Sequence, residues 1–168
     1  MNFTSSSLPF DTYISPFTWR YGSVEMRRIF SEKHKYELWR KLWVSLAKAQ
    51  SKNGLVSKKE LDDLVSHQSD IDIDRILILE KETKHDVVAA IREYAEKAKI
   101  GGGKIHLGAT SMDIVDNTDA IRQKEALAII SKAVRELLDL FSKKIVQYAD
   151  VSCMGYTHLQ PAEPTTVG

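Results

Sequence analysis

A single uninterrupted helical pattern near the end of this sequence limits its fold more than any other feature. Residues 117–148 contain neither glycine nor proline, so nothing local stops a helix there. At about 1.5 Å per residue such a helix spans roughly 48 Å, whereas a compact chain of this length has a diameter of about 40 Å. The helix is therefore longer than the globule that would carry it. Its apolar side chains form a helical stripe: Ile121, Leu127, Ile130, Val134, Leu137, Phe141, Ile145 and Tyr148.

An apolar stripe of that length needs helices of similar length to cover it. They would come either from sequence beyond residue 168 or from other subunits. We therefore expect this chain to be the N-terminal part of a larger helical-bundle protein. The prediction has two domains: an N-terminal helical domain over residues 1–111, and the beginning of a central bundle domain over residues 112–168.

Shorter helices are predicted in the first part of the chain. Residues 1–22 have two prolines and no period, so we expect an irregular arm there. A helical pattern begins at Ser23 and ends at Gly54. Residues 57–60, "SKKE", have the spacing of a capping box, which predicts a short helix through Val65. Within this pattern, residues recur every three or four positions at Tyr36, Trp39, Trp43, Leu46 and Gln50.

Two further helices follow in the pattern. The segment "SDIDIDRILILEKE" (69–82) begins with strand-like alternation, but most of its apolar positions fit a helix better. The segment "TKHDVVAAIREYAEKA" (83–98) predicts a helix with Thr83 as N-cap, Asp86 in its positive first turn, and Gly101–Gly103 as its end. The predicted fold class is therefore all-α.

Composition excludes several classes of function. The 24 basic and 23 acidic side chains nearly cancel, so charge does not favour binding to nucleic acid or to a membrane surface. No apolar run is long enough for a membrane span, and the first ten residues are not a secretory signal. The single Cys153 has no partner for an internal disulfide. We expect a cytoplasmic protein.

Four short polar stretches could carry chemistry: "RYGS" (20–23), "KHD" (84–86), "HLGATSMD" (106–113) and "YTHLQPAE" (156–163). None has the pattern of a metal site or of a phosphate-binding loop. The first pairs an Arg fork with a Tyr hydroxyl, a combination suited to phosphate or carboxylate. The second opens a helix, where the backbone N–H groups and the dipole favour an anion. Each also has a plain structural interpretation, namely a surface Arg beside a packed Tyr, and an N-terminal capping cluster.

The other two stretches are equally ambiguous by themselves. Thr110 and Ser111 can either donate to an anion or simply cap the long helix. His106 is better explained as a hydrogen-bonded structural histidine than as an acid or base. His158 lies in a setting that could lock one orientation of its imidazole, with Pro161 fixing the turn.

In this order, "KHDVV", "HLGATSMDIVDNTDA" and "YTHLQPAEPTTVG" resemble the regions of the fumarase/aspartase superfamily that precede its catalytic loop. Within it, the Arg-Tyr-x-Ser of the arm is similar to the adenylosuccinate lyase family. The resemblance covers nearly all of residues 18–168. Lys84 departs from the Arg that this family usually has, so a cation remains but bidentate recognition is lost. The family's Ser-rich loop, Ser-Ser-x-Met-Pro-x-Lys-x-Asn-Pro, is not found in these residues.

The resemblance implies a lyase that cleaves the C–N bond of adenylosuccinate, giving AMP and fumarate, and acts likewise on the succinyl-carboxamide ribotide. It implies β-elimination without a cofactor or metal, with a serine of the Ser-rich loop as the base. His158 corresponds to the general acid, a role that suits imidazole. Substrate binding is expected from Arg20 and Tyr21 at the phosphate, from Lys84, His85 and Asp86 at the nucleotide, from Thr110 and Ser111 at the succinyl carboxylates, and from Thr157 and Gln160 beside His158.

The resemblance also implies a homotetramer with sites shared between subunits, a small-molecule substrate, and no nucleic-acid or membrane partner. Two alternatives stay open at this point. One is another lyase of the superfamily, of the argininosuccinate or carboxymuconate type, although the phosphate-binding Arg-Tyr pair argues against both. The other is a catalytically inert helical oligomerisation fragment.

Overall fold

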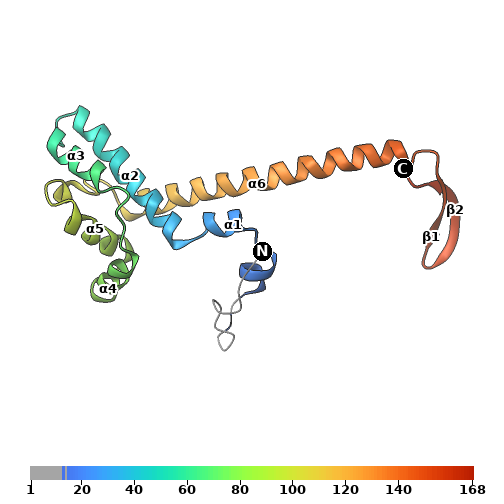
Figure 1. Ribbon diagram of the computed structural model, residues 1–168, viewed down its shortest axis with the longest axis horizontal. Coiled ribbons are helices and arrows are strands. Elements are labelled where there is room, and N and C mark those ends of the chain that lie inside the picture. Colours follow the sequence, from blue (N-terminus) through green and yellow to red (C-terminus); the bar gives the residue numbers. More distant parts are fainter. Residues whose placement is uncertain (1–12, 14) are drawn as a thin grey trace. The chain divides into compact units, whose positions relative to one another are not determined.

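The computed structural model describes residue 13 and residues 15–168 of the chain (Figure 1). It forms two compact units, Met1–Lys124 and Glu125–Gly168. The predicted domain boundary after residue 111 stays a prediction. The elements in chain order are a π-helical turn (Phe17–Tyr21), α1 (Val24–Ile29), α2 (Glu32–Lys52), α3 (Lys58–Ser66), α4 (Ile73–Thr83), α5 (Asp86–Lys97), a 3-10 turn (Gly102–Lys104), α6 (Ser111–Gln147), β1 (Ser152–Thr157) and β2 (Gln160–Thr166).

Local capping explains where the early helices begin. The predicted capping box of α3 is confirmed: the Ser57 hydroxyl accepts from the Glu60 N–H at 3.3 Å, and the Glu60 carboxylate accepts from the Ser57 N–H at 2.7 Å. The helical pattern predicted to run from Ser23 to Gly54 is divided, because Ser31 starts a new helix by accepting from the His34 N–H at 3.2 Å. The stop at Gly54 is confirmed, since its φ is +77°.

Two predicted helix ends were wrong. Thr83 is the last residue of α4, and the N-cap of α5 is His85. Lys84, between them, has a left-handed φ of 54°, which breaks the helix one residue after Thr83. At its other end α5 stops at Lys97, before the glycines, and Gly102–Lys104 forms a 3-10 turn. The helix over "SDIDIDRILILEKE" is confirmed as α4.

The core of the first unit lies among α2, α3, α4, α5 and the start of α6. Trp39 and Trp43 on α2 are both 2% exposed, as their helical spacing predicted. The Tyr94 ring of α5 packs 6.2 Å from that of Trp43, and the Tyr94 hydroxyl donates to the Leu64 carbonyl of α3 at 2.6 Å. Burial raises the pKa of Tyr94 to about 12, so this donor stays protonated. Apolar packing and one buried hydroxyl bond thus join α2, α3 and α5.

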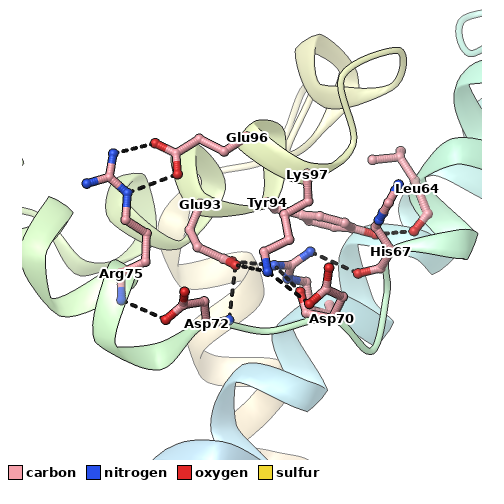
Figure 2. A network of polar contacts seen from close by, with 10 residues as sticks. Leu64, His67, Asp70, Asp72, Arg75, Glu93, Tyr94, Glu96 and Lys97 are labelled. Carbon is pink, nitrogen blue, oxygen red and sulfur yellow. Dashed lines mark hydrogen bonds and ion pairs between the residues drawn. The ribbon is translucent and has the colours of Figure 1, made fainter.

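A buried ion pair lies beside this core. Arg40 of α2 bonds the carboxylate of Glu93 of α5, and both side chains are almost fully buried. The Arg40 guanidinium also lies 3.4 Å from the centre of the Tyr94 ring and donates to the His67 carbonyl at 3.3 Å. The Asp72 N–H donates to the other Glu93 oxygen at 3.1 Å, and Figure 2 shows this network from close by. These contacts fix the loop before α4, and with it the start of α4, against α5.

The second unit contains the rest of α6 and a β-hairpin that the sequence analysis did not predict. β1 and β2 pair antiparallel, from Ser152 opposite Thr166 to Thr157 opposite Gln160, with a bulge beside Tyr156. The chain after β2 returns to the residue that follows α6, since the Gly168 N–H donates to the Tyr148 carbonyl at 2.9 Å. α6 begins six residues before the predicted start at residue 117 and ends at Gln147.

Candidate functional site

The Arg20–Tyr21 pair lies on the π-helical turn, so the prediction of an irregular arm was wrong for these residues; residues 1–12 and 14 lie outside the described part of the chain. The Arg20 guanidinium lies 4.5 Å from the centre of the Trp19 ring, and the Tyr21 side chain is 68% exposed. A Cβ at Gly22 would approach the Phe17 carbonyl oxygen to 2.6 Å, so the turn needs glycine there. The pair therefore presents a cation and a hydroxyl to solvent from a tight turn.

Ser23 connects this turn to α1. Its hydroxyl accepts from the Met26 N–H at 3.1 Å, which makes Ser23 the N-cap of α1. Only Gly22 and Ser23 separate Tyr21 from the first residue of α1, so the orientation of α1 sets the position of Arg20 and Tyr21.

The "KHD" stretch forms the junction between α4 and α5. Asp86 accepts from the Val87 N–H at 2.7 Å, and Nδ1 of His85 accepts from the Val88 N–H at 3.5 Å. The capping cluster is thus present, and it occupies N–H groups that an anion would otherwise use. Any anion bound here must be recognised mainly by side chains, and those of His85 and Asp86 are about half exposed. Lys84 is exposed at the same junction.

The "HLGATS" connector is attached to α2 at two points. The Trp43 indole N–H donates to Nδ1 of His106 at 3.1 Å, and the Gln50 amide donates to the Leu107 carbonyl at 2.6 Å. His106 and Gly108 both have positive φ, 65° and 71°. His106 is therefore a hydrogen-bonded structural histidine, as the sequence favoured, and the connector is held in a tight bend before α6.

This bend presents Thr110 and Ser111 at the N-terminus of α6. Thr110 is exposed and Ser111 half-buried. The Asp113 carboxylate accepts from the Thr110 N–H at 2.8 Å, which is half of a capping box. Sequence reasoning missed Asp113, although the Thr-x-x-Asp spacing of the cap could have revealed it.

Electrostatics connects these two stretches within the first unit. Burial lowers the pKa of His106; the charge of Asp113 raises it, and that of His85 lowers it further. His85, at the start of α5, and Asp113, at the start of α6, therefore both lie within electrostatic range of His106. The starts of α5 and α6 are thus electrostatically coupled through His106.

His158 lies at the tip of the β-hairpin in the second unit. His158 and Leu159 are the two central residues of the turn, with φ of 50° and 64°, and Thr157 pairs with Gln160 across it. Pro161 was predicted to fix this turn, which was wrong, because it lies in β2 opposite Tyr156. Positive φ in a residue other than glycine costs about 1–3 kcal/mol and is concentrated at functional sites. The hairpin thus exposes His158 on a strained turn.

The predicted site residues therefore fall into two sets. Those from Arg20 to Ser111 belong to the first unit, and Thr157, His158 and Gln160 belong to the second. Across residue 13 and residues 15–168, no three His, Cys, Asp or Glu side chains gather as they would around a metal ion. Over the same residues, no helix is long and apolar enough to cross a membrane.

A family described as lyase matches residues 20–168. The chain belongs to this lyase family. Among curated relatives, this lyase chain is 39% identical over 158 residues to the adenylosuccinate lyase of Methanocaldococcus jannaschii, which covers 92% of the chain and 34% of the relative. It is 38% identical over 160 residues to that of Schistosoma mansoni, covering 95% of the chain and 33% of the relative. It thus spans about a third of the length of the curated relatives that it matches.

Solved structures confirm the predicted fold of this lyase chain. It resembles a fumarate lyase from Mesorhizobium sp. BNC1 with a TM-score of 0.77 and 23% identity, covering 84% of the chain and 34% of that protein. It also resembles a 3-carboxy-cis,cis-muconate lactonizing enzyme from Pseudomonas putida with a TM-score of 0.79 and 24% identity, covering 90% and 36%. The fold is the helical one of the fumarase type, to which the structure adds the small hairpin.

Proposed function

We propose that this chain is part of an adenylosuccinate lyase. Such an enzyme cleaves adenylosuccinate to AMP and fumarate and acts on the succinyl-carboxamide ribotide in the same way. The observation that carries the proposal is the 38–39% identity to adenylosuccinate lyases over more than nine-tenths of the chain. The exposed Arg20–Tyr21 pair supports it, because a nucleotide substrate carries a phosphate that an Arg and a Tyr hydroxyl can bind.

The reaction is a β-elimination. A base removes the proton from the carbon beside a carboxylate, the C–N bond breaks, and an acid protonates the leaving nitrogen. Negative charge grows on the carboxylate before the bond breaks, so fixed donors and cations stabilise the transition state. In our proposal Thr110 and Ser111 bind the succinyl carboxylates, while Lys84, His85 and Asp86 contact the nucleotide.

His158 is the proposed general acid. An imidazole can give a proton to the leaving nitrogen and regain it after the reaction. The strained turn supports this role because it presents the imidazole at the tip of a hairpin. Thr157 and Gln160 pair across the turn and are the proposed substrate contacts beside it. The base is proposed to be a serine of the Ser-rich loop pattern, which these residues do not contain.

The assembly is proposed to be a cytoplasmic homotetramer with sites shared between subunits. α6 supports this, because its large apolar side chains from Leu127 to Val146, apart from the partly buried Ile129, are about half or more exposed. A shared site would combine the two sets of residues described above from different subunits.

The test is the His158→Ala substitution in a lyase subunit of the relatives' length, with His67→Ala as the matched control. Removing a positioned acid lowers kcat by about 10²–10⁴-fold, while KM changes much less because proton donation develops in the transition state. His67 caps the end of α3 and belongs to none of the proposed site stretches. A near-normal kcat in His158→Ala would show that His158 is not the general acid. Turnover by the 168-residue chain alone would contradict the proposal that sites are shared between subunits.

A further inference from the structure

One arginine of α6 reaches the segment that carries Arg20 and Tyr21. Nε of Arg122 donates to the carbonyl of Ile29 at 3.0 Å, across 93 positions of sequence. The Arg122 guanidinium lies 5.1 Å from the centre of the Phe30 ring, and its Nη1 bonds the Asp119 carboxylate at 3.2 Å. Only 14% of the Arg122 side chain is exposed. Arg122 thus uses the face of its guanidinium and two of its nitrogens in one fixed geometry.

Two of the residues that Arg122 contacts, Ile29 and Phe30, end α1. Ile29 is the last residue of that helix and is 5% exposed, and Phe30 is its C-cap. α1 has only 6 residues, and a helix that short has little stability of its own. Its orientation therefore depends on tertiary contacts such as the bond from Arg122.

Residues 17–23, called the arm below, border an open pocket. A cavity of about 280 Å³ lies between the π-helical turn and α1, lined by Phe17, Thr18, Gly22, Met26, Arg27 and Phe30. The arm joins α1 directly through Gly22 and the Ser23 cap, so its position follows the orientation of α1. Phe30 belongs both to this cavity and to the contact with Arg122.

We propose that Arg122 is a positioning residue that places Arg20 and Tyr21 for the nucleotide phosphate. Arg122 and Ser111 lie on the same helix about 16 Å apart at 1.5 Å per residue. The contact therefore ties the phosphate-binding arm to the helix whose first turn carries the carboxylate-binding residues. The inference rests on the proposed function, since it assigns the phosphate to Arg20 and Tyr21.

The first experiment needs only the 168-residue chain. Arg122→Met keeps the apolar stem and removes every donor, and Arg92→Met changes an exposed Arg of α5 as control. Amide hydrogen exchange over residues 17–29 should become about tenfold faster in Arg122→Met, which corresponds to a loss of roughly 1.4 kcal/mol. Exchange in α3, α4 and α5 should stay unchanged, which shows that the chain is folded. Unchanged exchange over residues 17–29 overturns the proposal.

The second experiment measures function in a subunit of the relatives' length. Arg122→Met should raise KM for adenylosuccinate about tenfold with kcat within about twofold, because phosphate binding contributes equally to ground and transition states. Arg122→Lys, which keeps one donor for Ile29, should recover part of the loss. In an Arg20→Ala background, Arg122→Met should raise KM little further, because the side chain that Arg122 positions is already absent.

The two levels of proposal fail differently. If Arg20→Ala leaves KM unchanged in a folded enzyme, the phosphate assignment itself is wrong. If Arg20→Ala raises KM while Arg122→Met does not, or if the two effects simply add, the phosphate assignment stands and the positioning role of Arg122 is overturned.

Discussion

The indole N–H of Trp43 donates a hydrogen bond to Nδ1 of His106, with 3.1 Å between the two nitrogens. The bond requires an unprotonated Nδ1, so the neutral imidazole carries its proton on Nε2. Burial acts in the same direction and lowers the pKa of His106. The connector that presents Thr110 and Ser111 is thus anchored by a histidine that the fold keeps neutral.

This bond predicts how stability depends on pH. Because the pKa of His106 is lower in the folded chain than its ordinary 6.5, the unfolded chain binds the proton first as the pH falls. The contribution of His106 to the free energy of unfolding is therefore complete above about pH 6.5 and decreases down to the depressed folded pKa. Trp43→Phe removes the donor and raises the folded pKa of His106, which should flatten this dependence. Urea unfolding at several pH values measures the pH dependence of the free energy of unfolding, and NMR follows the titration of His106. An unchanged titration in Trp43→Phe would show that the indole bond does not affect the pKa of His106.

A second prediction concerns the Arg40–Glu93 pair. Arg40→Met leaves the Glu93 carboxylate, which is 0% exposed, without its main partner, and breaking a buried pair costs about 3–5 kcal/mol. The matched control is Arg75→Met, because Arg75 and Glu96 form an exposed bidentate pair between α4 and α5. Exposed pairs contribute about 0–1 kcal/mol. Urea unfolding measures the loss in the free energy of unfolding for each variant. Equal losses in Arg40→Met and Arg75→Met would show that the buried pair contributes no more than the exposed one.

The helices with strong local signals could be predicted from sequence. The Ser57–Glu60 box and the spacing of Trp39 and Trp43 are short-range patterns, and both were confirmed. The break at Ser31 was not predicted, although the N-cap serine itself is a local signal. The contacts that hold the end of α1, from Ile29 and Phe30 to Arg122, are not local: Arg122 lies 93 positions from Ile29, and no window of sequence contains both.

The hairpin was missed for a different reason. A two-residue turn with positive φ at both centres normally shows Asn-Gly or a similar pair, whereas this chain has His158 and Leu159. The stretch around His158, which indicated a functional histidine, therefore lacked the usual sequence signal of a hairpin turn. Of the site, the motif residues could be proposed from sequence, but the supporting contacts of Trp43, Gln50 and Asp113 required the fold.

The same turn supplies a third prediction. The Leu159 side chain is 92% exposed, so its replacement loses little packing, while its φ of 64° is strained for any residue except glycine. Leu159→Gly should stabilise the hairpin by up to about 1 kcal/mol, and the β-branched Leu159→Val should destabilise it. Amide exchange over Ser152–Thr157 measures both, and equal exchange in the two variants would show that the backbone at Leu159 is not strained.

The last prediction concerns the exposed face of α6. Leu137 and Phe141 are 52% and 56% exposed one turn apart, and an apolar surface of this length normally marks an interaction site. We expect the 168-residue chain to associate with itself through this face. Replacing both residues by Glu should give a monomer, because a buried interface does not accept unpaired charges.

The control is the pair Lys132→Gln and Lys143→Gln, which changes the net charge by the same amount at positions on the other side of the helix. Sedimentation velocity at several concentrations, together with binding of a hydrophobic dye, distinguishes the outcomes. The unsubstituted chain and the control should form oligomers whose mass rises with concentration, whereas the double Glu variant should sediment as a monomer. A monomeric unsubstituted chain that binds no dye would show that the apolar stripe of α6 is not an interface, and the proposed homotetramer would then lose its physical basis in these residues.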